Sequence, residues 1–131
     1  MSRRDEIVPI ILERLKQLEN FDQVTYWQAT PSQYEQNHLN LNDGIEKYQP
    51  KNNKYDAQLE LMIEAVVIET AQKSAADLGN LALKDLITAV NSLTLSGAIF
   101  QLKQSNKFVE TQGKTACLVE LVIQVLYKFD R

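Results

Sequence analysis

Two long stretches of alternating apolar and polar side chains constrain the fold of this chain more than any other feature. The first runs from Ala57 to Thr70 and the second from Thr115 to Phe129. Alternation with a period of two predicts β-strands, and the apolar second half of the first strand predicts increasing burial. A strand of this length would reach about 46 Å, which is long for a small domain and suggests assembly with other chains.

Two amphipathic helices are predicted from apolar residues at helical spacing. The first is expected from Ser2 or Asp5 to Leu18, with a capping box formed by Ser2 and Asp5 and with Pro9 in its opening turn. The second is expected to follow the capping box Ser74–Asp77 and to continue to Leu95, where Ser96-Gly97 ends it.

The segment from Asp22 to Tyr55 is predicted to hold one strand and a polar excursion. The strand covers Asp22–Ala29 and is ended by Thr30-Pro31-Ser32. The polar stretch Pro31–Tyr55 is either a short hairpin with a tight turn at Asp43-Gly44, in which Ile45–Tyr48 is the return strand, or a largely mobile loop. Its length suggests a functional loop.

Three strands are predicted near the C-terminus, the last of which is the second long stretch described above. They cover Ala98–Lys103, Phe108–Thr111 and the long stretch Thr115–Phe129, with turns at Gln104–Asn106 and Gln112–Lys114. Because short turns join consecutive strands, antiparallel pairing is expected.

The expected fold is therefore a two-layer α+β domain. A mainly antiparallel or mixed β-sheet would carry two amphipathic helices packed on one face. We expect a single domain over residues 1–131, with the polar loop excursion at about 31–56.

Composition and charge exclude several function classes. The 131 residues carry 14 Lys and Arg against 17 Asp and Glu, a net charge of −3, which argues against a strongly basic duplex-binding domain. The longest nearly unbroken apolar run, Leu121–Tyr127, is interrupted by Gln124 and is too short to span a bilayer. Met1–Glu6 does not resemble a secretory signal. The lone Cys117 fits a reducing compartment without a disulfide framework.

Residues that could carry chemistry are few and scattered. The only histidine, His38, is expected on a polar surface loop, and Cys117 is expected to be buried as a small hydrophobe. Glu60 and Glu64 share one strand face about 13 Å apart, too far for a catalytic pair. Asp43 resembles part of a calcium loop that lacks the remaining ligands. We therefore expect no catalytic residue, cofactor site or metal site.

One cluster of basic and aromatic residues lies in the polar excursion. It comprises Lys47, Tyr48, Lys51, Lys54 and Tyr55. Such a cluster either forms a solvated loop or contacts nucleic acid, the latter if the loop lines a channel through which DNA passes.

The order of elements resembles a known family of structural proteins. The residues that carry the resemblance are the basic N-terminal helix from Arg3-Arg4 to Leu18, the strand entry Phe21-Asp22-Gln23-Val24, the strand Leu59–Glu64, the helix segment Leu83–Val90 and the closing strand ending Leu126-Tyr127. With its variable polar loop, this arrangement resembles the tail terminator (tail completion) proteins of long-tailed bacteriophages and prophages, the family that includes the lambda terminator.

The resemblance implies a structural function without catalytic residues. Such proteins form a ring, usually of six subunits, on the head-proximal end of the tail tube, where they stop tube polymerisation and form the head–tail joining surface. The implied partners are copies of itself, the tail-tube protein and a head-completion or neck protein, with DNA passing through the lumen. The implied location is the virion tail and, during assembly, the bacterial cytoplasm.

Interface residues are expected in the loop from Pro31 to Tyr55 and along the first long strand. The candidates are Lys51, Lys54, Tyr55, Glu60, Glu64 and Glu69. Lys51 and Lys54 are candidates for facing the lumen. The alternatives are a neck or head-closure protein, an adaptor that binds a partner by its sheet edge, and a small enzyme or RNA-binding domain.

Overall fold

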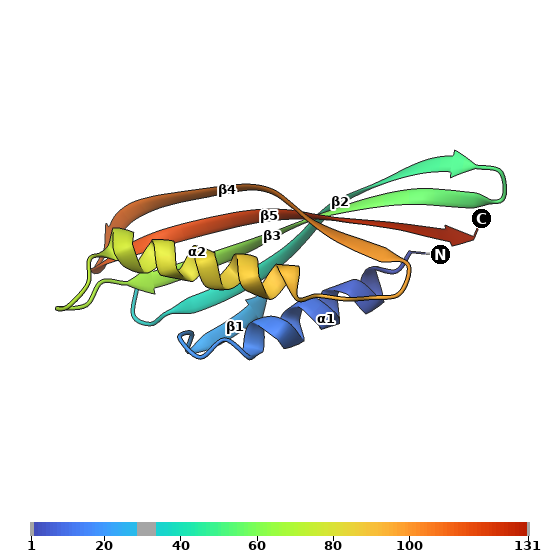
Figure 1. Ribbon diagram of the computed structural model, residues 1–131. Coiled ribbons are helices and arrows are strands. Elements are labelled where there is room, and N and C mark those ends of the chain that lie inside the picture. Colours follow the sequence, from blue (N-terminus) through green and yellow to red (C-terminus); the bar gives the residue numbers. More distant parts are fainter. Residues whose placement is uncertain (1, 29–33, 131) are drawn as a thin grey trace.

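A single mixed sheet organises the described residues, which are 2–28 and 34–130 of this computed structural model. Five strands lie in the order β1-β2-β3-β5-β4, and two helices pack along them (Figure 1). All neighbouring strands are antiparallel except β1 and β2, which are parallel, so the predicted α+β class with a mainly antiparallel sheet is confirmed. The elements are α1 (Arg4–Lys16), β1 (Gln23–Tyr26), β2 (His38–Lys51), β3 (Lys54–Ile68), α2 (Ala75–Asn91), β4 (Ala98–Gln112) and β5 (Lys114–Asp130).

The two long strands predicted from alternation are β3 and β5, and they pair with each other over their whole length. The register runs from Lys54 opposite Asp130 to Ile68 opposite Ala116. Odd-numbered residues of both strands point to one side, here called the core face, and even-numbered residues point to the other, here called the open face. The long apolar alternation therefore stabilises the centre of the sheet.

The hydrophobic core lies against the core face. The buried side chains of both helices belong to one cluster with the odd-numbered residues of β3 and β5. Each fully buried Leu or Ile contributes about 1.5–3 kcal/mol relative to an exposed one. The largest buried members are Ile7, Ile11, Leu15, Leu39, Leu41, Leu59, Leu61, Ile63, Leu86, Val90, Leu121 and Ile123.

The polar stretch that was expected to be a loop excursion is mostly strand. The predicted tight turn at Asp43-Gly44 and the separate return strand Ile45–Tyr48 are wrong, because β2 continues through them. A β-bulge between Asp43 and Glu46 absorbs the glycine and restores pairing with β3. The chain reverses instead at Asn52-Asn53, where Asn52 adopts a positive φ of 54° that asparagine tolerates.

The predicted turn at Gln104–Asn106 is also wrong. One continuous strand, β4, replaces the two short strands that were expected on either side of it. A second bulge, between Leu102 and Gln104, shifts the register without ending the strand. The predicted turn at Gln112–Lys114 is confirmed, with Gly113 in the left-handed region between β4 and β5.

The helix boundaries agree with prediction better at α2 than at α1. The Ser74 side chain accepts a hydrogen bond from the Asp77 backbone N–H and caps α2, but this helix ends at Asn91 rather than Leu95. Helix α1 has no side-chain cap, so the predicted capping box of Ser2 and Asp5 is wrong. Pro9 lies inside α1, beyond its opening turn.

The predicted strand Asp22–Ala29 is shorter than expected. Only Gln23–Tyr26 form β1, and Trp27 follows with a positive φ of 55°. The expected end of the strand at Thr30-Pro31-Ser32 lies outside the described residues.

Candidate interaction surface

One end of the sheet extends past both helices. It is formed by residues 47–51 of β2, 54–58 of β3 and 126–130 of β5, here called the arm. Figure 1 shows this end reaching beyond the N-terminal end of α1 and the C-terminal end of α2. The length that made the predicted strands unusual for a small domain therefore lies in part in the arm.

Aromatic side chains stiffen the arm on its core-face side. Phe129 lies at the centre of the group, with ring centroids 5.3 Å from Tyr55, 5.6 Å from Tyr48 and 6.0 Å from Tyr127. Such pairs contribute about 0.5–1.5 kcal/mol each beyond their buried area. The predicted interface residue Tyr55 is therefore half-buried within the arm rather than on a loop.

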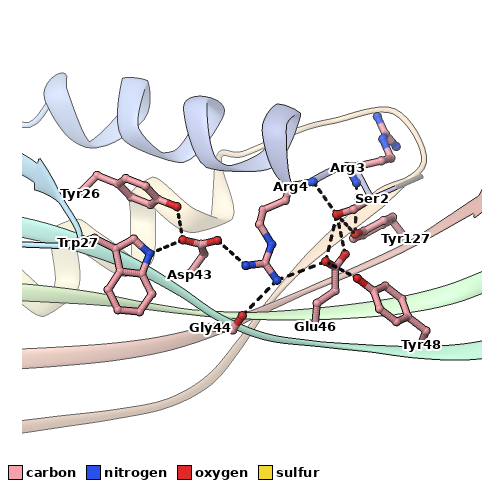
Figure 2. A network of polar contacts seen from close by, with 10 residues as sticks. All are labelled: Ser2, Arg3, Arg4, Tyr26, Trp27, Asp43, Gly44, Glu46, Tyr48 and Tyr127. Carbon is pink, nitrogen blue, oxygen red and sulfur yellow. Dashed lines mark hydrogen bonds and ion pairs between the residues drawn. The ribbon is translucent and has the colours of Figure 1, made fainter.

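An ion-pair network attaches the base of the arm to α1 (Figure 2). Arg4 Nη1 donates to Asp43 Oδ2 at 2.8 Å, and Arg4 Nη2 lies 3.3 Å from a carboxylate oxygen of Glu46. Arg4 Nη2 also donates to the carbonyl oxygen of Gly44, which belongs to the bulge. One guanidinium thus binds the three residues around the irregularity in β2.

Asp43 is buried within this network, as is the side chain of Glu46. Asp43 accepts hydrogen bonds from the Tyr26 hydroxyl and, at 2.6 Å, from Trp27 Nε1. Burial opposes ionisation of Asp43, but these hydrogen bonds and the charge of Arg4 together lower the pKa of its carboxyl group. The network therefore ties β1, β2 and α1 together through a single carboxylate.

Glu46 extends the same network to β5. Its carboxylate accepts hydrogen bonds from the Ser2 hydroxyl at 3.0 Å and from the Tyr48 hydroxyl at 2.8 Å. The Ser2 hydroxyl in turn lies 3.2 Å from the Tyr127 hydroxyl. These contacts hold the start of the chain against the arm, and nothing in the local sequence pattern predicts them.

The open face carries opposite charges at its two ends. In the arm, the paired positions on this face hold Lys47, Lys51, Lys54, Asp56, Lys128 and Asp130. In the rest of the sheet, here called the body end, the charged residues at paired positions are Glu60, Glu64, Glu110, Lys114 and Glu120. The arm is therefore mainly basic, and the body end is mainly acidic.

Apolar side chains lie between the glutamates of the body end. Leu118 and Val122 of β5 are half-buried on the open face. Their register partners on this face include Met62 of β3 and Phe108 of β4, and Phe108 is exposed. The apolar surface on this face is therefore bordered by carboxylates.

Five of the predicted interface residues lie on β3 or at the tip of the arm. Lys51 pairs with Asp56 at 2.8 Å, and Lys54 pairs with Asp130 at 3.6 Å. Glu60 is exposed, whereas Glu64 is half-buried and accepts a hydrogen bond from Asn42 at 2.7 Å.

The sixth predicted residue lies apart from them. Glu69 follows β3, and its carboxylate accepts a hydrogen bond from the Ala75 N–H in the first turn of α2. This contact joins the segment that follows β3 to the start of α2, and Glu69 therefore lies away from the arm.

His38 does not lie on a surface loop as expected. It is the first residue of β2, is buried, and its Nε2 lies 2.7 Å from the Thr25 hydroxyl on β1. Burial lowers the pKa of His38, against a smaller opposing effect of Glu64. The polar neighbours of His38 suggested a loop, but parallel pairing with β1 covers it.

Cys117 is completely buried on the core face, as predicted. Burial raises the pKa of its thiol. Within residues 2–28 and 34–130, no group of three His, Cys, Asp or Glu side chains is arranged to hold a metal ion.

Exposed large hydrophobic residues gather at the two edges of the sheet. Ile99, Leu102, Phe108 and Val109 lie on β4, while Tyr26, Trp27, Ile45 and Tyr48 lie on or beside β1 and β2. Among the described residues, the one such side chain elsewhere is Leu81 on α2. The outer edge of β4 pairs with no other strand in the described part of the chain.

No family model matches this chain, and no curated protein matches it at a significant level. Among the helices of the described residues, none has the length and apolar character needed to cross a membrane.

Proposed function

We propose that this protein is a structural, non-enzymatic component of a bacteriophage or prophage tail that assembles with copies of itself into a ring. The observation that carries the proposal is the gathering of exposed hydrophobic residues at two opposite edges of the sheet. Water-exposed apolar patches of this kind mark surfaces for protein association.

The two edges favour a ring because they differ from each other. One edge is the long strand β4, which contains one bulge, and the other combines the short parallel strand β1 with the uncovered part of β2. When one edge of a copy binds the different edge of the next copy, each end of the growing series keeps one free edge. Such a series either closes into a ring or grows into an open filament. An unpaired strand edge also supports backbone pairing with a neighbour.

The arrangement of layers supports the same proposal. We infer that α1 and α2 together cover the core face, since the buried residues of both belong to one cluster with it. The open face and the arm then remain available for contacts with neighbouring molecules. In the ring, the arm would be the part that reaches furthest from its own subunit.

The ring would sit on the head-proximal end of the tail tube. There it would end tube polymerisation and form the surface that joins tail to head, as in the tail terminator family that the sequence resembles. Its partners would be the tail-tube protein and a head-completion or neck protein, with DNA passing through the lumen of a ring of six subunits. Its location would be the virion tail and, before assembly, the host cytoplasm.

The test measures self-association of edge variants. Sedimentation velocity and negative-stain electron microscopy of the purified protein should show rings, and binding to tail-tube protein should promote them. Val109→Ser on β4 and Ile45→Ser on β2 should each reduce ring formation at least tenfold, because each removes an exposed apolar contact from one edge. Leu81→Ser, which removes a similarly exposed side chain from α2, is the matched control.

A strict monomer at every concentration, with no binding to tail-tube protein, would show that this proposal is wrong. Equal loss of rings in Leu81→Ser and the edge variants would show that the edges have no special role.

A second candidate function has one specific observation in its favour. The outer edge of β4 is long and, from Gln104 to Gln112, continues without a bulge, which suits the addition of a strand from a different protein. An adaptor of this kind would stay monomeric alone and would protect the β4 amides from hydrogen exchange when its partner binds.

A further inference from the structure

Most opposite charges on the open face lie far apart within one molecule. Lys47 is the exception, because its register partner Gln58 is two positions from Glu60 on the same face. Lys54 and Glu64 lie on the same strand ten positions apart, which corresponds to about 33 Å. Charges in solvent are largely screened beyond about 8 Å at physiological ionic strength. Charges separated by this distance therefore contribute little to the stability of one chain, but they can attract the opposite charges of another chain.

The arm offers basic side chains that can reach a partner. Lys47, Lys51 and Lys54 are all exposed on β2 and β3. Lys51 already pairs with Asp56, while Lys47 forms no ion pair within the described residues. Four lysines against two aspartates leave the arm with an excess of positive charge on this face.

The body end offers the complementary surface. Glu60 and Glu120 flank the centre of the sheet on the open face, with Met62 and Val122 between them in register. Glu60 forms no ion pair within the described part of the chain, and Glu120 accepts one long hydrogen bond of 3.4 Å from Asn106. An approaching lysine would therefore displace no ion pair of Glu60 or Glu120, whereas Lys51 and Lys54 would exchange their ion pairs within the arm for pairs with these glutamates.

We propose that the arm of one copy lies on the body end of the open face of a second copy. Its lysines then face the glutamates, and its apolar atoms cover Val122 and Leu118. This inference rests on the proposed self-assembly and adds a second contact between subunits to the one at the sheet edges. Because arm and body end are different parts of the chain, each copy can receive one arm and offer its own.

A second copy of the chain fits these charges better than nucleic acid does. The lysines of the arm share their face with Asp56 and Asp130, which would repel phosphates. A surface that binds DNA backbone usually gathers basic residues without interspersed carboxylates. The acidic body end needs a basic partner, and the arm supplies one from the same sequence.

Charge reversal provides the experiment. The arm variant carries Lys51→Glu and Lys54→Glu, and the body variant carries Glu110→Lys and Glu120→Lys, which leaves the neighbouring residues Lys47 and Glu60 unchanged. Each should assemble at least tenfold more weakly than the wild type in sedimentation velocity, since like charges then face each other across the contact. An equimolar mixture of the two variants should assemble again, as should one chain that carries all four substitutions.

The four-substitution chain separates a lost contact from lost folding, because it contains every change that the two weaker variants contain. A matched control reverses exposed charges on the helices, with Glu13→Lys and Lys84→Glu in one chain, and should assemble like the wild type. Wild-type assembly should also weaken as salt concentration rises.

The outcomes distinguish this contact from the proposed function as a whole. If the wild type forms rings and the arm and body variants form them equally well, the contact is wrong and the proposed ring stands. If the wild type never associates, the proposed ring itself is wrong. Loss of binding to a DNA duplex by the arm variant, with its rings intact, would overturn the contact in favour of nucleic acid.

Discussion

Gly79 of α2 lies directly against Cys117 of β5. A Cβ atom at position 79 would overlap Cys117 Sγ and would come 3.0 Å from Cys117 Cβ. Glycine inside a helix costs about 1 kcal/mol relative to alanine, so its presence here is explained by the close approach of helix and sheet. This contact sets how deeply the N-terminal half of α2 packs on the core face.

Gly79→Ala is therefore expected to destabilise the protein by about 1–3 kcal/mol, despite the better helix propensity of alanine. The added methyl group must push α2 away from β5 or distort Cys117. Urea unfolding followed by circular dichroism measures the change in free energy of unfolding. Lys84→Ala, at an exposed position of the same helix, should change it by less than about 0.5 kcal/mol. A neutral or stabilising Gly79→Ala would contradict the packing.

Asp43→Asn should lower the free energy of unfolding by about 2 kcal/mol at neutral pH, because the substitution removes the charge that receives hydrogen bonds from Arg4, Tyr26 and Trp27. The pKa of Asp43 is lowered in the folded state, so its stabilising effect is present above the unfolded pKa of about 3.9. That effect is lost as pH falls through the folded-state pKa.

The two proteins should therefore converge in stability at acidic pH. Urea unfolding across the acidic range tests this, with Glu13→Gln on the exposed face of α1 as the control. A constant difference between wild type and Asp43→Asn at all pH values would contradict the assignment of the lowered pKa to Asp43.

His38 should remain neutral in the folded protein at pH values where an exposed histidine is half protonated. Its folded-state pKa is lowered, so the unfolded chain binds more protons just below about pH 6.5. Stability should therefore fall as pH decreases from about 6.5 toward the folded-state pKa and then stop changing on this account. NMR titration of the imidazole measures the pKa directly, since the sequence contains one histidine. An ordinary value near 6.5 would disprove the effect of burial.

Cys117 should resist alkylation by iodoacetamide in the folded protein and react fully in guanidinium chloride. Its side chain is completely buried and its thiol pKa is raised, which lowers the fraction of reactive thiolate. Mass spectrometry counts the label. A Ser105→Cys variant, which places a second thiol on an exposed position of β4, should take up one label rapidly while Cys117 stays unlabelled. Fast labelling of Cys117 itself would show that α2 separates easily from the sheet.

Sequence reasoning was most successful where one local rule dominates. The alternation of Ala57–Thr70 and Thr115–Phe129 identified β3 and β5, and the Ser74 cap located the start of α2. It failed at Asp43-Gly44, where a dipeptide that usually makes a turn lies in a bulge. The reason is tertiary, because pairing with β3 satisfies backbone groups on both sides of the bulge and outweighs the local turn preference.

The candidate surface was predictable only in part. Charged residues on the long strand were identified from its alternation, and Glu60 and Glu64 do share one face. The arm was missed because its residues Lys47, Tyr48 and Lys51 were assigned to a polar loop. The network around Arg4 was missed because its members are distant in sequence and none of them forms a local motif.

The sequence by itself determined the two central strands, the capped helix α2 and the α+β class, since periodicity and capping depend on neighbours along the chain. Only the tertiary structure decided that β2 runs unbroken into the arm and that His38 is buried beside β1. It also decided that most lysines and glutamates occupy opposite ends of one sheet face. Those properties depend on which strand lies beside which, and in what register, and both are set by long-range pairing rather than by local preference.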